Sequence, residues 1–331
     1  MKKYKVAVLG ATGLVGTHIV DGLQEREFPI SELIPLASEG RDRTVRFGGE
    51  EIPVRAASFD KFNGVDLVFN CAGNEAARTF LSQLAKKETV CIDKSTAFRL
   101  DTSVPLIIPE VNGSQMKRHQ GIIASPNCLT IQLVMALWPV YCHLNLDKVV
   151  LSTYQSASGA GTSALQALKR QMRGDTTAKS SSLPHSVAGN AFPEIGGFVE
   201  DGFSTEESKI TAETQKIIED RELPVTVTAV RIGVEVGHAV SVWCQTSETV
   251  NAENLVEILD DCEWLTVSSE PHQYHTPKQA AGTDEVFVGR IRTDKTDERA
   301  FWMWITADNL RKGAATNAIQ IAETLMNEDL I

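Results

Sequence analysis

The chain has 331 residues, of which 42% are hydrophobic and 23% charged, and its formal net charge is −11. This length and apolar content are sufficient for two domains, whereas the acidic balance argues against a nucleic-acid-binding surface. No segment approaches the roughly 20 consecutive apolar residues of a membrane helix, and the apolar run from Val6 to Leu9 is too short for a signal peptide. Six scattered cysteines without a CxxC pair are typical of reduced thiols, so we expect a cytoplasmic protein.

The first third of the chain alternates between short apolar runs and helical patterns. Residues 5–9 predict a strand that leads into a glycine-rich turn and then a helix from Thr17 to about Glu25. A second helical pattern covers residues 75–86. Further strands are expected at 33–37, 65–70, 89–92, 106–108 and 122–124. This alternation predicts a mainly parallel, doubly wound α/β sheet.

After Asn127 the pattern changes. An apolar helix (129–143) is followed by a β-branched strand (148–154) and a loop rich in small residues (174–190). The later strands look longer and more alternating, which favours a mixed or antiparallel sheet; they are expected at 225–230, 239–245, 285–288 and 301–306. We therefore predict a dinucleotide-binding domain at 1–127, completed by a C-terminal helix at 309–331, and a catalytic and dimerisation domain at 128–308.

The glycine-rich turn reads Gly-Ala-Thr-Gly-Leu-Val-Gly at residues 10–16, a GxxGxxG variant of the dinucleotide fingerprint. Glycines allow the backbone to approach a pyrophosphate, and the following helix directs its N-terminal N–H groups at that group. A plain strand-to-helix turn is the alternative. After the second strand, Ser38 with Arg41 or Arg43 would suit the 2′-phosphate of NADP, whereas Glu39 leaves NAD open.

Cys128 stands in the segment Ser-Pro-Asn-Cys-Leu-Thr-Ile-Gln, where a predicted strand gives way to an apolar helix. A helix N-terminus lowers the pKa of a thiol and supplies N–H groups for an oxyanion. This context favours a nucleophile, although most free cysteines are buried structural residues.

Arg231 and His238 lie at the end of one predicted strand and the start of the next. A histidine is a natural acid/base partner of a cysteine, and an arginine binds a carboxylate through two bonds. A strand-end histidine can equally be structural. The pair His272 and His275 has no third ligand nearby, so no metal site is predicted.

Taken in order, these motifs resemble those of the aspartate-semialdehyde dehydrogenase family over nearly the whole chain. The matching segments are the glycine turn (10–16), the PNCLTIQ motif (126–132), the YQSASGAG turn (154–161) and the DNLRKGAA segment (308–315). The resemblance implies a Rossmann domain joined to an α+β catalytic and dimerisation domain, as in glyceraldehyde-phosphate dehydrogenases. It also implies a homodimer, in some members a tetramer, that acts in lysine, threonine and methionine biosynthesis.

The resemblance also implies roles for individual residues. Cys128 would be the nucleophile, His238 the acid/base, and Gln155 the residue that orients the acyl group. Arg231 would bind the substrate carboxylate, Glu206 its ammonium group, and Arg99 and Lys209 the phosphate. The substrates implied are aspartyl phosphate, aspartate semialdehyde and phosphate. The NADP site would be lined by Gly10, Thr12, Gly13, Leu14, Val15, Ser158, Gly159 and Gln320, in addition to Ser38 and Arg41.

Four features depart from the family pattern: Lys94 in place of Asn, Leu129 in place of a small residue, Gly233 in place of Pro, and a short loop after Ser38. They leave room for a catalytically silent or altered-specificity paralogue. The related N-acetyl-γ-glutamyl-phosphate reductases are a further alternative, but their cysteine motif is closer to PGCYPT.

Overall fold

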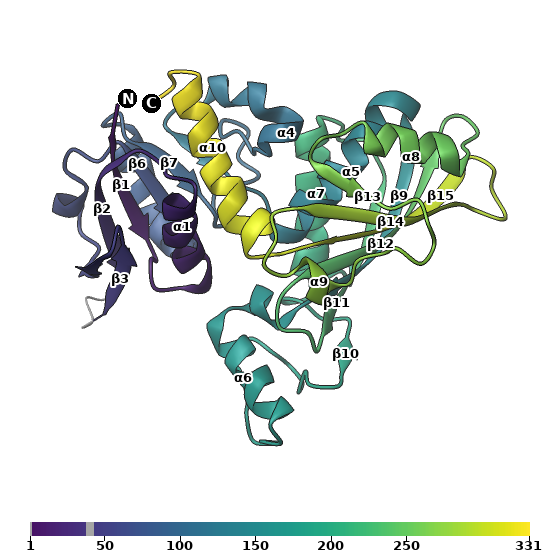
Figure 1. The fold of residues 1–331 in the computed structure, drawn as a ribbon, viewed down its shortest axis with the longest axis horizontal. Helices are drawn as coiled ribbons and strands as arrows, with labels where there is room; N and C mark the ends of the chain where they lie inside the picture. Colours follow the sequence, from purple (N-terminus) through teal and green to yellow (C-terminus); the bar gives the residue numbers. More distant parts are fainter. Residues whose placement is uncertain (1, 38–42) are drawn as a thin grey trace. The chain divides into compact units, whose positions relative to one another are not determined.

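The computed structural model describes residues 2–37 and 43–331, which form two compact units (Figure 1). The first unit runs to Asn127 and resumes at Ala314, and the second comprises Cys128–Gly313. The chain thus returns to the first unit at 314, later than the predicted boundary at 308. None of the described helices is long and apolar enough to cross a membrane.

The first unit is built on a parallel sheet with the strand order β5-β2-β1-β6-β7-β8. The predicted doubly wound α/β architecture is confirmed. The central strands are apolar on both faces because helices cover both sides. The bounds are β1 Tyr4–Leu9, β2 Ile30–Ala37, β5 Arg55–Ala56, β6 Leu67–Asn70, β7 Val90–Asp93 and β8 Ile122–Ala124, with a separate hairpin of β3 Thr44–Phe47 and β4 Glu50–Pro53.

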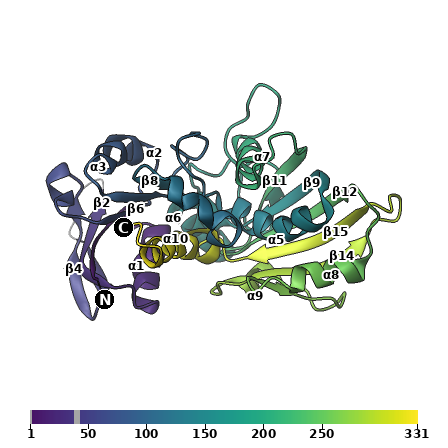
Figure 2. The ribbon, with the colours of Figure 1, turned by 90° about the horizontal axis from the view of Figure 1, so that it is seen from above.

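Two helices from opposite ends of the chain share one face of this sheet. α1 (Leu14–Glu25) packs beside α10 (Thr316–Asn327), and α2 (Asn74–Ala76) and α3 (Ser82–Ala85) lie on the other face (Figure 2). Leu23 and Ile319 belong to the same buried core, and Arg26 forms an ion pair with Glu323 at 2.7 Å. The short α4 (Pro109–Asn112) also contacts α10.

Three local predictions differ from the structure. α1 begins at Leu14 rather than Thr17, because Gly13 adopts an extended backbone and serves as its N-cap. Residues 106–108 form no strand, and Leu106 makes an isolated bridge with Ala124. The α-helical part of the closing segment begins at Thr316, since residues Arg311–Ala315 are π-helical.

The second unit contains a seven-stranded mixed sheet with the order β10-β11-β9-β12-β15-β14-β13, as the alternating strand patterns predicted. Helices α5, α7 and α8 pack against it. The strands are β9 Leu146–Gln155, β10 Ala191–Phe192, β11 Val225–Ile232, β12 His238–Thr246, β13 Leu265–Val267, β14 Val286–Thr293 and β15 Ala300–Ala307. The helices are α5 Cys128–Leu144, α6 Thr162–Met172, α7 Thr205–Ile218, α8 Ala252–Asp260 and α9 Pro277–Ala280.

Candidate active site

Three polar residues stand side by side at one edge of the second sheet. Gln155, the last residue of β9, is in register with Arg231 of β11 and with His238 of β12. Residues that face each other across neighbouring strands project from the same side of a sheet. All three are therefore on the side that also carries the buried apolar residues of these strands, and each is less than 5% exposed.

The Gln155 side chain is held from two directions. Thr153 Oγ1 donates to its Oε1 over 3.0 Å, and its Nε2 donates to Oε1 of Glu206 over 3.1 Å. Glu206 lies in the first turn of α7, whose N-cap Ser204 forms a reciprocal capping box with Glu207. This capping fixes the start of the helix and hence the Glu206 carboxylate. Lys209, one turn further on, places its Nζ 3.9 Å from that carboxylate.

Arg231 is 4% exposed and donates from Nη1 to the Ser156 carbonyl over 2.5 Å. Its Nε is buried and has no partner among the described residues. Burial lowers the pKa of Arg231, and the neighbouring Glu206 and Cys128 oppose that shift. A guanidinium remains charged at neutral pH, so the site holds a buried cation with an unused donor.

His238 is fully buried, and its two ring nitrogens have different surroundings. Nδ1 accepts the backbone N–H of Ser156 over 3.1 Å, whereas Nε2 has no partner among the described residues. Burial and the positive charge of Arg231 lower the pKa of His238 from 6.5 to about 3. The imidazole is therefore neutral across the physiological range.

Cys128 is the first residue of α5, as predicted. Gly313 packs directly against it, and a Cβ added at Gly313 would lie 3.2 Å from the Cys128 Cβ. The charge of Cys128 raises the pKa of Arg231 and so opposes the effect of burial. A helix N-terminus and a nearby cation both favour a thiolate.

The turn after β9 contributes Ser158 and Gly159. A Cβ added at Gly159 would lie 3.0 Å from Nε2 of His238 and 3.2 Å from Nη1 of Arg231. The absence of a side chain therefore allows the turn to pack closely against both groups. Together, the second unit brings together the predicted residues Cys128, Gln155, Ser158, Gly159, Glu206, Lys209, Arg231 and His238.

The glycine turn of the first unit brings backbone segments into close contact. Gly10 has a φ of 88°, and a Cβ at Gly16 would lie 2.1 Å from the Gly10 carbonyl oxygen. α1 begins without a capping side chain or an acidic residue in its first turn, so its N–H groups suit an anion. Thr12, Gly13, Leu14 and Val15 lie at this turn, and Ser38 and Arg41 lie outside the described residues.

Arg99 and Gln320 also belong to the first unit. Arg99 is buried and donates to the carbonyl oxygens of Ser125 and Lys94 over 3.0 and 2.8 Å. Gln320 donates its amide to Glu110 over 2.9 Å. The described residues include no cluster of three or more His, Cys, Asp or Glu side chains suited to a metal ion.

The departures from the family pattern have local structural reasons at two positions. A Cβ at Gly233 would lie 2.5 Å from the Val187 carbonyl oxygen, so the backbone of residues 187–189 leaves no room there. The Lys94 ammonium donates to Oγ of Ser125 and to the Pro126 carbonyl over 3.0 and 3.2 Å. Nothing in the structure explains why Leu129, which is fully buried, replaces a small residue.

Sequence reasoning missed Asn309 and Ser156 as site residues. Both lie within motifs that the sequence analysis quoted, but neither side chain suggests a reaction. Asn309 accepts the N–H of Gly237 over 2.8 Å, and Ser156 contacts Nδ1 of His238. The only sequence signal was their position, since Asn309 follows Asp308 and Ser156 follows Gln155.

Comparison with known proteins places the chain in a family. Residues 5–119 match the model of the semialdehyde dehydrogenase NAD binding domain, and residues 137–312 match that of the semialdehyde dehydrogenase dimerisation domain. The aspartate-semialdehyde dehydrogenases of Aquifex aeolicus and Bacillus subtilis are 44% and 37% identical, with 99% and 98% of both chains covered in each case. A crystal structure of aspartate semialdehyde dehydrogenase II from Vibrio cholerae complexed with ASA superposes with a TM-score of 0.94 at 36% identity, covering 99% of both chains.

Proposed function

Because the chain belongs to the aspartate-semialdehyde dehydrogenase family, we propose that it catalyses the reversible, NADPH-dependent reductive dephosphorylation of L-4-aspartyl phosphate to L-aspartate 4-semialdehyde. One observation carries the proposal. The buried guanidinium of Arg231, with its Nε unpartnered among the described residues, lies close to Glu206 and Cys128. A cation, an anion and a thiol together match an amino acid with a reactive carbonyl.

Each end of the substrate has a partner of suitable charge. The Arg231 guanidinium can bind the α-carboxylate through its free Nε. Glu206 is the anion available to the ammonium group, and Gln155 has a second amide hydrogen beyond the one that Glu206 accepts. Lys209 and Arg99 are the cations that we assign to phosphate.

The reaction that follows from these assignments forms and breaks one bond to sulfur. The Cys128 thiolate attacks the acyl carbon, phosphate leaves with its bonding electrons, and a thioester remains. A bound NADPH would supply the hydride that reduces the thioester carbonyl carbon. The resulting oxyanion then expels the thiolate, which releases the aldehyde and restores Cys128. His238, which we assign as the acid/base, faces this carbonyl oxygen and aids the collapse to the aldehyde.

NADP is the cofactor that we propose, with NAD as the alternative. The matched NAD binding domain and the open N-terminus of α1 support a dinucleotide. Arg43, after β2, is an exposed cation in the segment that would meet a 2′-phosphate.

The absence of disulfides among the six cysteines is consistent with a cytoplasmic enzyme of lysine, threonine and methionine biosynthesis.

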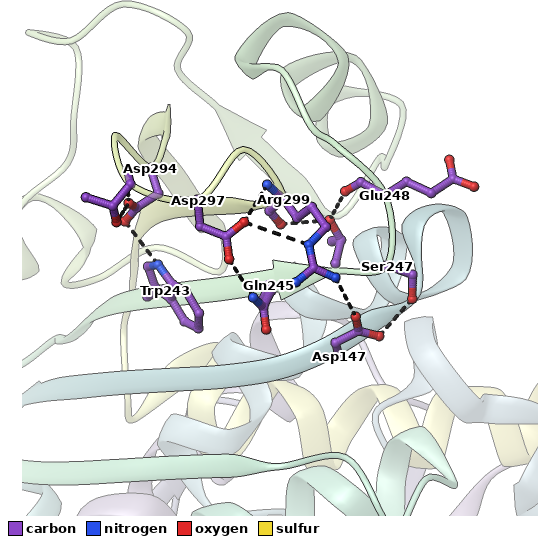
Figure 3. A network of polar contacts seen from close by, with 10 residues as sticks. Asp147, Trp243, Gln245, Ser247, Glu248, Asp294, Asp297 and Arg299 are labelled. Atoms are coloured by element: carbon purple, nitrogen blue, oxygen red, sulfur yellow. Dashed lines mark hydrogen bonds and ion pairs between the residues drawn. The ribbon is translucent and has the colours of Figure 1, made fainter.

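A homodimer is part of the proposal, and its interface is assigned to the face of the second sheet opposite the active-site residues. This face carries Val150, Tyr154, Trp243, Trp302 and Trp304, which are half-buried or exposed in the single chain. Asp294 accepts the indole N–H of Trp243 over 3.1 Å (Figure 3). It also accepts the indole N–H of Trp302 over 2.8 Å. The indoles therefore present apolar surface, and the match to a dimerisation domain supports a second copy as its partner.

The alternatives make different predictions. A catalytically silent paralogue would be expected to lose the cysteine or its partners, yet Cys128, Gln155, Arg231 and His238 are all present. The substrate of an N-acetyl-γ-glutamyl-phosphate reductase carries an acetylated amino group, which has no positive charge for the Glu206 carboxylate to bind.

The test is phosphate-dependent reduction of NADP by L-aspartate 4-semialdehyde, followed by absorbance, with Cys128→Ala as the inactive variant and Cys142→Ala as the matched control on the same helix. We expect NADPH formation by the wild type and by Cys142→Ala, and none by Cys128→Ala. A folded wild type without activity on NADP or NAD would refute the proposal. Turnover of only the N-acetylated glutamate analogue would favour the reductase.

A further inference from the structure

Asn309 forms a polar junction directly after β15. It is 2% exposed, accepts the Gly237 N–H at Oδ1 over 2.8 Å, and donates from Nδ2 to Oγ of Ser158 over 3.0 Å. Gly237 immediately precedes His238 in the sequence. The junction therefore holds both the backbone that leads into His238 and the turn that faces its ring.

The junction reaches the imidazole through two serines. Oγ of Ser158 lies 3.0 Å from Oγ of Ser156, and Ser156 lies 3.1 Å from Nδ1 of His238 through both its backbone nitrogen and its Oγ. Oγ of Ser156 is also 3.1 Å from Oδ1 of Asn309. These groups form a closed network in which each hydroxyl has a donor and an acceptor partner.

The hydrogens of this network can be assigned by elimination. The Ser156 backbone N–H points at Nδ1, and an amide nitrogen cannot accept a hydrogen bond. Nδ1 must therefore offer its lone pair, and the hydrogen of the neutral ring is on Nε2. Asn309 supports this state by donating from Nδ2 to Oγ of Ser158, so that the Ser158 hydroxyl can donate to Ser156 and the Ser156 hydroxyl can donate to Nδ1.

We propose that Asn309 is a positioning residue that acts through Ser158 and Ser156 to hold His238 as the neutral Nε2–H tautomer, with this N–H directed at the substrate carbonyl oxygen. The inference rests on the proposed function. Nε2 is a fully buried polar atom with no partner among the described residues, and it lies close to the backbone of Gly159. A buried donor of this kind requires an acceptor, and a ligand oxygen is the acceptor that the reaction provides.

The surrounding charges agree with a ring that stays neutral. The positive charge of Arg231 from β11 acts on His238, while Glu206 from α7 and Cys128 from α5 act on the guanidinium. Burial and Arg231 both lower the pKa of the imidazole. In this state His238 stabilises the oxyanion by a hydrogen bond through thioester formation, hydride addition and collapse. The same Nε2–H is the proton that His238 holds as the acid of the proposed reaction.

Nitrogen NMR of the ligand-free protein tests the tautomer directly, because protonated and bare imidazole nitrogens differ widely in shift. The resonances of His238 are identified by their loss in His238→Gln. We expect a protonated Nε2 and a bare Nδ1 in the wild type, and mixed tautomers in Asn309→Ala. Asn112→Ala is the control, since Asn112 is also buried and bonds two backbone groups, but in the first unit; it should leave the tautomer unchanged.

Kinetics provides a second readout. We expect Asn309→Ala to lower kcat by roughly 10- to 100-fold, with a smaller change in KM. In Asn309→Asp the new negative charge should raise the pKa of His238, so the acid limb of the kcat profile should move to higher pH.

A wild-type ring protonated at Nδ1, or a tautomer and kcat unchanged in Asn309→Ala, would overturn the inference. If Asn309→Ala fails to fold, the wild-type spectrum and Ser158→Ala decide. The NMR result is independent of substrate, so it stands apart from the outcome of the activity assay.

Discussion

The amide of Gln155 donates to the carboxylate of Glu206 over 3.1 Å, joining the end of β9 to the first turn of α7. Oγ1 of Thr153 accepts the Val230 N–H and therefore donates its own hydrogen to Oε1 of Gln155. These contacts give the Gln155 amide one orientation. The group that we assign to the acyl substrate and the group that we assign to its ammonium are thus parts of one rigid arrangement.

From this contact we expect Gln155→Glu to reduce kcat/KM for aspartate 4-semialdehyde by about 100-fold, because a second carboxylate would repel Glu206 and remove the amide donor. Gln155→Ala should also lose activity but retain stability better. Steady-state kinetics measures both, and the exposed Gln273→Ala serves as the control. Wild-type kinetics in Gln155→Glu would show that the amide does not contact substrate.

A substitution at Gly233 tests how closely the backbone packs around residue 187. Gly233→Ala should lower the free energy of unfolding by about 1–3 kcal/mol, since its Cβ would lie 2.5 Å from a carbonyl oxygen. Gly197→Ala is the matched control, because a Cβ there meets nothing within 4 Å. Urea denaturation of the two variants gives the comparison, and equal midpoints would contradict the packing described here.

Gly16 tests the dinucleotide site. Gly16→Ala should displace the Gly10 carbonyl, which a Cβ would approach to 2.1 Å, and so weaken NADP binding at least 10-fold. Gly13→Ala should be milder, because its Cβ would be 3.4 Å from the same oxygen. Titration of NADP by fluorescence measures both dissociation constants. The glycine turn would be excluded from the cofactor site if neither variant changed them.

His238 makes stability depend on pH on the acidic side. Its pKa is about 3 in the folded chain and 6.5 ordinarily, so the unfolded chain binds more protons between these values. The stabilisation is complete above pH 6.5 and is lost as the pH falls towards 3, by up to a few kcal/mol. The difference in unfolding free energy between wild type and His238→Gln should therefore shrink or reverse from pH 7 to pH 4. A difference independent of pH would show that the imidazole titrates normally.

The face of the second sheet that we assign to the dimer interface predicts the oligomeric state. Val150→Arg should convert the dimer to monomers in sedimentation velocity, because it places a charge at the centre of an apolar interface. Met172→Arg, at an exposed apolar residue of α6 in the same unit, should leave the dimer intact. A Val150→Arg variant that remains dimeric would place the interface elsewhere, and a larger wild-type species would indicate a tetramer.

Local sequence patterns determined much of the architecture. The strand–glycine–helix pattern at residues 5–25 predicted the first parallel unit, since a turn with glycines at 10, 13 and 16 suits a close approach of backbones. Cys128 was predicted at a helix start because its neighbours change from polar to apolar there, and α5 begins at that residue. These features depend on residues near one another in the chain, which is why sequence alone revealed them.

The contacts of the site depended on the tertiary structure. Gln155, Arg231 and His238 became neighbours through a parallel and an antiparallel strand pairing, and no local pattern sets that register. Asn309 reaches Ser158 across 151 positions of sequence. The residues themselves determined which chemistry was available. Long-range strand pairing decided which nitrogen of His238 is held by a donor and which is left for substrate, because a hydrogen bond requires two groups to meet in space.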